Sequence, residues 1–134
     1  MFMKPFEKHA YALLRIVAGF TFMWHGSQKL LNLPASGHTF PFYLKYVAGP
    51  IEFFGGLLIL IGLATSWVAF LTSGEMAVAY WKAHAPTAIL PLLNRGELAA
   101  LYCFIFLFIA TRGAGIWSVD SLIARGSKVR LTPE

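Results

Sequence analysis

The sequence predicts an all-α protein, a four-helix transmembrane bundle with a short C-terminal interfacial helix. Two observations lead to this prediction. Of the 134 residues 57% are hydrophobic and 13% are charged, whereas soluble domains carry about 25% charged residues. The apolar residues also form four long blocks separated by turn-forming residues, at about 10–32, 47–64, 67–84 and 92–112. We expect one integral membrane domain over residues 1–134, in which each block forms one helix.

The first helix is expected over about 10–32. Its apolar run follows Lys4 and Lys8, an arrangement that signal peptides share. Arg15 interrupts the run early, which disfavours a signal peptide because the apolar region of such a peptide is continuous. We therefore expect this segment to be retained as a helix.

The other three helices are expected over about 47–64, 67–84 and 92–112. Residues 53–74 contain no charged side chain, and residues 98–110 are apolar on every face. The alternative is a soluble bundle, because several charge-free cores are only about 10 to 14 residues long. A helix that is apolar all round needs apolar surroundings on all sides, which a soluble four-helix bundle does not provide. The sequence therefore favours membrane insertion.

Two short patterns suggest how the helices begin and repeat. Glu52 and Glu97 each stand at the third position of a predicted helix, where a carboxylate can bond the cap amide. The segment 49–52, followed by two glycines, is similar to the segment 94–97, followed by two alanines. This similarity suggests two helical hairpins related by duplication. The segment 116–126 is expected to form the interfacial helix, with Gly126 at its end.

The basic residues indicate how the chain crosses the membrane. Most of them lie on the side that holds both termini, namely Lys4, Lys8, Arg112, Arg125, Lys128 and Arg130. By the positive-inside rule, both termini are expected in the cytoplasm of a bacterial inner membrane. The net charge of +5 does not indicate nucleic-acid binding, because the basic residues form no dense patch interleaved with aromatic residues. The expected partners are the lipid bilayer and other protein subunits.

Ionisable residues interrupt the apolar blocks, and at membrane depth such residues mark a functional site. Most of them are predicted to meet in the outer half of the bundle. Glu75 and Lys82 are expected to share a face of the third helix, because seven residues at about 100° each leave them about 20° apart. The candidate catalytic residues are His25, Lys29, Glu75 and Lys82. The candidate ligand-binding residues are Arg15, Glu52, His84 and Glu97.

The spacing of the histidines and carboxylates does not favour a metal. Carboxylate-bridged metal bundles use Glu-x-x-His pairs, and neither Glu75 nor Glu97 has a histidine at that spacing. Trp24 and Trp81 stand near His25 and His84 and would crowd a haem ring. Cys103 is the single cysteine, so the chain has no internal dithiol. Redox chemistry would therefore require a cofactor or a partner.

Four motifs together resemble the DoxX family of small four-helix membrane proteins. They are Leu14-Arg15-Ile16 with Gly19, His25-Gly26-x-x-Lys29, Glu52-x-x-Gly55-Gly56, and the exit segment from Gly113 to Asp120. The match covers about residues 9–126. The family includes the DoxD-type subunit of thiosulfate:quinone oxidoreductase, and other members are linked to oxidoreductase complexes that handle thiols and oxidative stress. The resemblance implies a subunit or accessory protein of a membrane oxidoreductase system.

Three functions remain open from the sequence. The first is a quinone-linked redox subunit, with a quinone as the candidate cofactor. The second is a non-enzymatic membrane assembly or interaction protein, since no motif in the chain completes a catalytic site. The third, transport of a small solute or protons, rests on the intramembrane charges alone. The sequence does not decide whether the chain is catalytic by itself.

Overall fold

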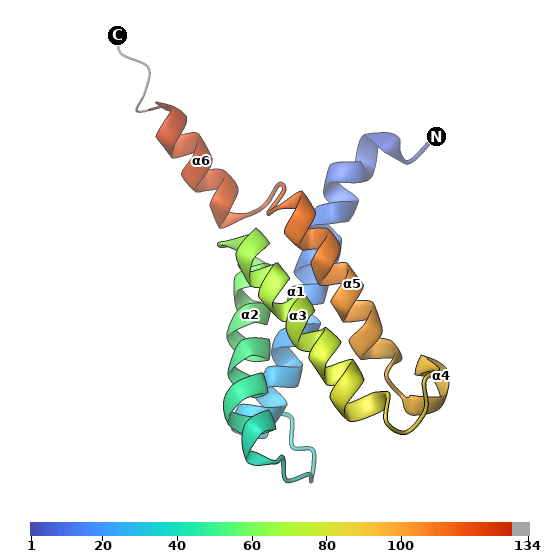
Figure 1. Ribbon diagram of the computed structural model, residues 1–134. Helices are drawn as coiled ribbons and strands as arrows, with labels where there is room; N and C mark the ends of the chain where they lie inside the picture. Colours follow the sequence, from blue (N-terminus) through green and yellow to red (C-terminus); the bar gives the residue numbers. More distant parts are fainter. Residues whose placement is uncertain (130–134) are drawn as a thin grey trace.

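The computed structural model describes residues 1–129, in which all regular secondary structure is helical and there are no strands. Figure 1 shows α1 (Glu7–Leu31), α2 (Gly49–Ile61), α3 (Thr65–Ala79), α4 (Pro91–Asn94), α5 (Glu97–Arg112) and α6 (Val119–Val129). A 3-10 turn, Lys4–Phe6, precedes α1. π-Helical segments lengthen α2 upstream (Leu44–Ala48) and α3 downstream (Tyr80–His84). Arg130, one of the basic residues used to predict topology, lies outside the described residues.

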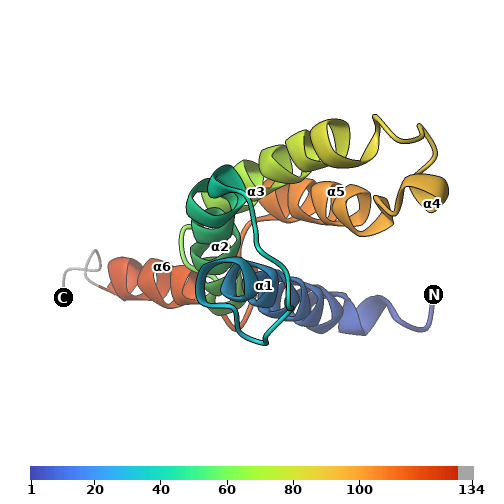
Figure 2. The same ribbon diagram turned by 90° about the horizontal axis from the view of Figure 1, so that it is seen from below.

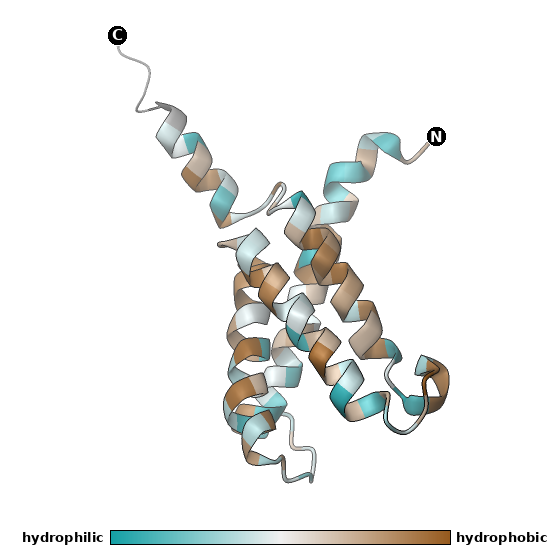
Figure 3. Ribbon diagram, viewed as in Figure 1, coloured by the Kyte–Doolittle hydropathy of each residue, from teal (hydrophilic) through white to brown (hydrophobic). Residues whose placement is uncertain are grey.

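The all-α prediction is confirmed, and the four long helical segments match the four apolar blocks. Figure 3 shows apolar residues along most of α2, α3 and α5. By length and composition, one helix in the described part of the chain could cross a membrane, Leu44–Ile61, with a mean hydropathy of 1.6. The fold class is therefore shown, whereas the membrane arrangement of the four helices is not.

The fourth helix starts later than the predicted residue 92. Residues 91–94 form the single turn α4, and the chain then breaks at Arg95, which has a positive φ of 58°. The buried side chain of Asn94 fixes this break: its amide donates to the Ala88 carbonyl (2.7 Å) and its oxygen accepts from the Gly96 amide (2.7 Å). α5 begins only at Glu97.

The predicted capping roles of Glu52 and Glu97 are wrong. Neither α2 nor α5 has a side-chain hydrogen bond to its cap. Glu52 lies inside a continuous helical segment, because the π-helical residues 44–48 precede α2. Both carboxylates are therefore free of the structural role that the sequence suggested.

α1 and α2 pack with their backbones in contact. A Cβ added at Gly26 would lie 2.2 Å from the Phe53 amide nitrogen, and one at Gly56 would lie 2.4 Å from the Met23 amide nitrogen. Only glycine fits at such a close helix crossing. This contact brings the C-terminal end of α1 directly against the N-terminal half of α2.

α3 and α5 form the second helical pair. Ala69, Met76, Phe106 and Ile109 are buried in the hydrophobic core between and around them. Ser73 on α3 donates to the Cys103 carbonyl on α5 (2.8 Å). Figures 1 and 2 show α2 next to α3, whereas α1 and α5 diverge towards the end that carries α4.

The end of the bundle that carries the exit segment is closed by Arg15, which is 0% exposed. Its guanidinium donates to two carbonyls at the end of α2 and to two in the exit segment that follows α5. These acceptors are Ile59 (2.7 Å), Leu60 (2.8 Å), Trp117 (2.7 Å) and Ile116 (3.4 Å). Arg15 therefore joins three distant parts of the chain.

Asp120 completes the same end of the bundle. Its amide donates to the Gly62 carbonyl (2.9 Å). Its carboxylate accepts from the amides of Ala64 (2.9 Å) and Thr65 (3.0 Å) and from the Thr65 hydroxyl (3.0 Å), so it caps the start of α3. We call Arg15, Asp120 and these partners the latch. The exit segment, from Gly113 to Asp120, therefore serves to join the end of α5 to α1, α2 and the start of α3.

The predicted C-terminal helix is present as α6, which extends away from the bundle (Figure 1). It begins at Val119 and runs through Gly126 to Val129, so the predicted end at Gly126 is wrong. A glycine whose backbone follows helical geometry does not terminate a helix. Leu122 and Ile123 are exposed on α6, as an interfacial helix requires.

Candidate functional site

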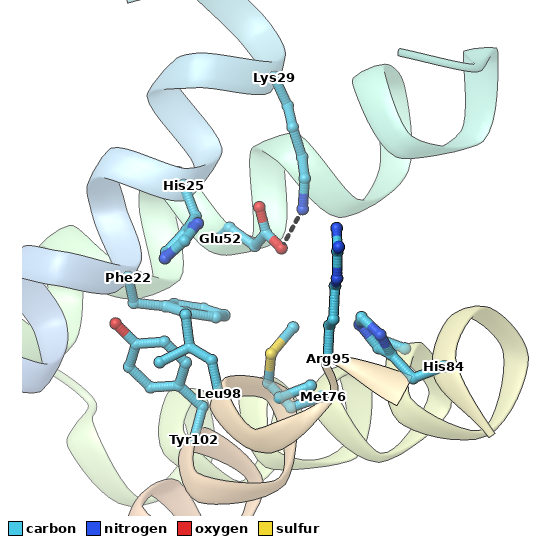
Figure 4. Close-up of a pocket in the computed structure, with 11 residues that line it drawn as sticks. Phe22, His25, Lys29, Glu52, Met76, His84, Arg95, Leu98 and Tyr102 are labelled. Carbon is cyan, nitrogen blue, oxygen red and sulfur yellow. Dashed lines mark hydrogen bonds and ion pairs between the residues drawn. The ribbon is translucent and has the colours of Figure 1, made fainter. Parts of the chain in front are cut away.

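A cavity of about 210 Å³ lies between the diverging ends of α1 and α5 (Figure 4). Five of its lining side chains are polar: His25, Lys29, Glu52, His84 and Arg95. The others are apolar or aromatic, among them Phe22, Met76, Leu98 and Tyr102. The cavity is therefore lined by charged and histidine side chains together with aromatic and apolar ones.

One side of the cavity, which we call the ionic wall, is formed by His25 and Lys29 of α1 and Glu52 of α2. His25 and Lys29 lie one helical turn apart on α1, and Gly26 between them lets α2 approach. Lys29 Nζ donates to Glu52 Oε1 in an ion pair, drawn as the dashed line in Figure 4. Glu52 is 2% exposed. The His25 ring meets the Tyr102 ring edge-on, with 6.0 Å between centroids.

Glu75 lies behind this wall on α3, one turn from the cavity-lining Ala79. Both of its carboxylate oxygens are buried, and neither has a hydrogen-bond partner within residues 1–129. The side chain is within electrostatic reach of Glu52 and Lys29. Oε2 of Glu52 is likewise buried and without a donor from the described residues.

The opposite wall comes from the break before α5. Arg95 stands at the left-handed turn that ends α4, and Figure 4 shows its side chain reaching across the cavity towards Lys29. Of the two ion pairs found in the described part of the chain, neither involves Arg95. His84 Nδ1 lies 3.0 Å from the Asn94 carbonyl, which holds the ring at the cavity edge.

The structure brings together five of the eight predicted site residues. His25, Lys29, Glu52 and His84 line the cavity, and Glu75 lies behind it. Lys82 and Glu97 are exposed and do not line it, and Arg15 belongs to the latch. Lys82 departs from the predicted face because residues 80–84 are π-helical, and the wider turns rotate each later side chain less than an α-helix does.

Two prominent lining residues were not among the predicted site residues. Arg95 precedes α5, and the left-handed turn that aims it inwards has no strong sequence signal beyond the glycine that follows. Tyr102 lies within residues 98–110, which the sequence predicts to be apolar on every face. Its hydroxyl donates to Thr21 on α1 (2.6 Å) and so joins α1 to α5 beside the cavity.

The arrangement suits the polar end of a largely apolar molecule. Lys29, Arg95 and the two histidines offer hydrogen-bond donors from opposite walls, and Phe22 and Tyr102 offer ring faces. A volume of about 210 Å³ is below the roughly 300 to 1,000 Å³ of sites that enclose a whole small molecule. Within residues 1–129, no three His, Cys, Asp or Glu side chains are grouped so as to hold a metal ion.

The model of the DoxX family matches residues 10–85, which include most of α1, all of α2 and α3, and the ionic wall. The chain belongs to the DoxX family. The resemblance seen in the sequence motifs is thereby confirmed, and proteins of the DoxX family are typically membrane-associated.

Two curated relatives match nearly the whole DoxX chain. An "Uncharacterized protein" of Haemophilus influenzae is 36% identical over 126 residues, which cover 89% of this chain and 94% of the relative. A Bacillus subtilis protein named "Putative oxidoreductase CatD" is 27% identical over 125 residues, covering 87% of this chain and 88% of the relative. No solved structure matches the chain.

Proposed function

We propose that this DoxX protein is an integral protein of a bacterial inner membrane that binds the head group of a quinone, as a subunit or accessory protein of an oxidoreductase system. The observation that carries the proposal is the small cavity, with cationic donors on two walls and aromatic rings between them. The name of the Bacillus subtilis relative favours an oxidoreductase system over unrelated membrane functions.

The outer surface of the helices supports a membrane location. Large apolar side chains on α1, α3 and α5 point away from the core, including Val17 (57% exposed), Trp67 (81%), Phe70 (64%), Leu101 (60%) and Phe104 (69%). Apolar surface of this extent needs a lipid or protein cover. Lipid around all four long helices accounts for it, with both termini on the basic, cytoplasmic side.

The chemistry of the cavity supports a quinone as the ligand. The two carbonyl oxygens of a quinone accept hydrogen bonds, which Lys29 and Arg95 can donate from opposite sides. The ring would stack near Phe22 and Tyr102. Because the cavity holds only a head group, the apolar tail would leave between the diverging α1 and α5, along their exposed apolar side chains.

A second candidate, a non-enzymatic assembly protein, rests on the Lys29–Glu52 ion pair. This pair joins α1 to α2 and is complete without a ligand. In that case the polar cluster fixes the helices, and the exposed apolar surface receives a partner subunit rather than lipid alone.

Binding of decylubiquinone, a short-tailed quinone, separates the two candidates. We expect saturable binding to the purified protein and a roughly tenfold weaker affinity in His25→Ala, because one hydrogen bond or ring contact at the head group is lost. His38→Ala is the matched control, since His38 is exposed in the loop after α1. Absence of binding, together with a partner polypeptide that copurifies, would support the assembly protein.

A further inference from the structure

The buried carboxyl of Glu75 is not explained by head-group binding. It lies on α3 behind the cavity, and both of its oxygens are shielded and unpartnered among residues 1–129. An ionised carboxylate in such a place loses its hydration and gains no donor in return. The neutral acid is the form that this site can accommodate at the lower cost.

A second buried carboxylate, that of Glu52, lies on α2 at the cavity wall. Glu52 is 2% exposed, and only its Oε1 is bonded, to Lys29. Glu52 and Glu75 interact electrostatically, and two carboxylates that share a site do not both ionise readily. One ammonium, one carboxylate and one carboxylic acid give this trio no net charge.

The other polar groups around the trio do not supply a further cation or donor to Glu75. Tyr102 on α5 directs its hydroxyl to Thr21, and His25 on α1 places its ring against Tyr102. Arg95 belongs to the opposite wall of the cavity. Lys29 is therefore the group whose position decides the charge balance of the two carboxylates.

We propose that Glu75 and Glu52 together hold one exchangeable proton behind the cavity, and that the Lys29 ion pair decides which of them carries it. While Lys29 bonds Glu52, the proton stays on Glu75. When a ligand oxygen in the cavity takes the Lys29 hydrogen bond, Glu52 loses its neutralising partner. Glu52 then competes with Glu75 for the shared proton, and the two carboxyls together still carry one proton and one negative charge.

This proton store deepens the proposed function and rests on it, because a quinone oxygen is the acceptor that competes for Lys29. The store keeps one proton next to the proposed quinone site, on a carboxyl that is shielded from water. It also makes ligand binding depend on pH. Of the two carboxyl residues only Glu52 lines the cavity, and Glu75 acts through it as a proton-holding residue.

Infrared spectroscopy of the reconstituted protein at neutral pH tests the store without any ligand. We expect a carbonyl band of a protonated carboxylic acid that shifts in D₂O, is lost in Glu75→Gln and is retained in Glu75→Asp. Glu97→Gln is the matched control, because Glu97 is exposed. A wild-type spectrum without this band overturns the proposal, even if the variants do not fold.

Decylubiquinone binding as a function of pH supplies the second measurement. Wild-type affinity should fall as pH rises, by up to about tenfold per pH unit for one linked proton, and Glu75→Gln should flatten this dependence. Equal pH dependence in both proteins overturns the proton store but leaves quinone binding intact. A normal infrared band with no decylubiquinone binding at any pH overturns the proposed function and leaves the protonated Glu75 standing.

Discussion

The latch and the cavity both enclose charged side chains, but they satisfy them to different degrees. In the latch, Arg15 donates four hydrogen bonds and leaves only Nε without a partner. The Asp120 carboxylate accepts three. At the cavity, Glu75 has no hydrogen-bond partner among the described residues, and Glu52 uses one of its two oxygens.

This difference separates structural charges from candidate ligand-binding charges. Buried polar groups in proteins are almost always hydrogen-bonded, so each unpartnered one needs an explanation. In the latch all but Arg15 Nε are paired, chiefly with backbone groups, so its charges are explained by folding. At the cavity the chain places charges that it does not fully pair. Substitutions in the latch should therefore lower stability, whereas substitutions at the cavity should mainly lower ligand affinity.

The largest loss of stability is expected for Arg15→Ala. The substitution leaves several buried carbonyls of α2 and the exit segment without a donor, which should cost about 3 kcal/mol or more. Thermal unfolding in detergent should show a strongly lowered midpoint or little folded protein. Arg125→Ala, at an exposed position on α6, is the control. An unchanged midpoint in Arg15→Ala would show that the latch does not hold the bundle.

A smaller loss is expected for Asp120→Asn, which weakens the cap of α3 by roughly 0.5 to 2 kcal/mol. Burial raises the pKa of Asp120, but the hydrogen bonds from Thr65 and Ala64 outweigh it and hold that pKa below its ordinary value of 3.8. The stabilisation is thus fully present above the ordinary pKa and is lost as pH falls through the lower, folded-state pKa.

Unfolding midpoints of the wild type and Asp120→Asn measured from pH 7 down to pH 3 check this sign. The gap between the two proteins should be constant near neutral pH and should narrow only at the acidic end. A gap that widened on acidification would contradict the proposed role of the ionised carboxylate.

The smallest effect on stability is expected for Arg95→Gln. The side chain is exposed and has no ion pair in the described part of the chain, so the free energy of unfolding should change by less than about 0.5 kcal/mol. Decylubiquinone affinity should nevertheless fall about tenfold, because a charged donor is lost from the cavity. Lys82→Gln removes an exposed cation outside the cavity and should change neither quantity. Equal losses of affinity in both variants would place the binding elsewhere.

Much of the fold could be predicted from the sequence, because helix position follows from apolar blocks and the turn residues between them. α1 and the segment 65–84 lie close to the predicted ranges. The break at Arg95 could not be predicted in the same way, since it depends on tertiary hydrogen bonds of Asn94 with Ala88 and Gly96. The membrane arrangement of the helices remains a prediction.

The candidate site was predictable in part for a similar reason. His25, Lys29 and Glu52 lie on regular helices that meet at glycines, so their positions follow from helical spacing. Lys82 could not be placed, because nothing in its local sequence marks the π-helical turn. The structural role of Arg15 could not be predicted, because its partners are backbone carbonyls, one of them 102 positions away, and backbone partners leave no pattern in the sequence.

The span of the latch also has a consequence for biosynthesis. Arg15 is made early, but two of its acceptors, Ile116 and Trp117, are made about a hundred residues later. A ribosome adds roughly 5 to 20 residues per second, so the nascent chain carries a half-paired guanidinium for several seconds. During that interval the growing protein depends on water, lipid head groups or an insertion factor to shelter this charge, and translation of the exit segment ends that dependence.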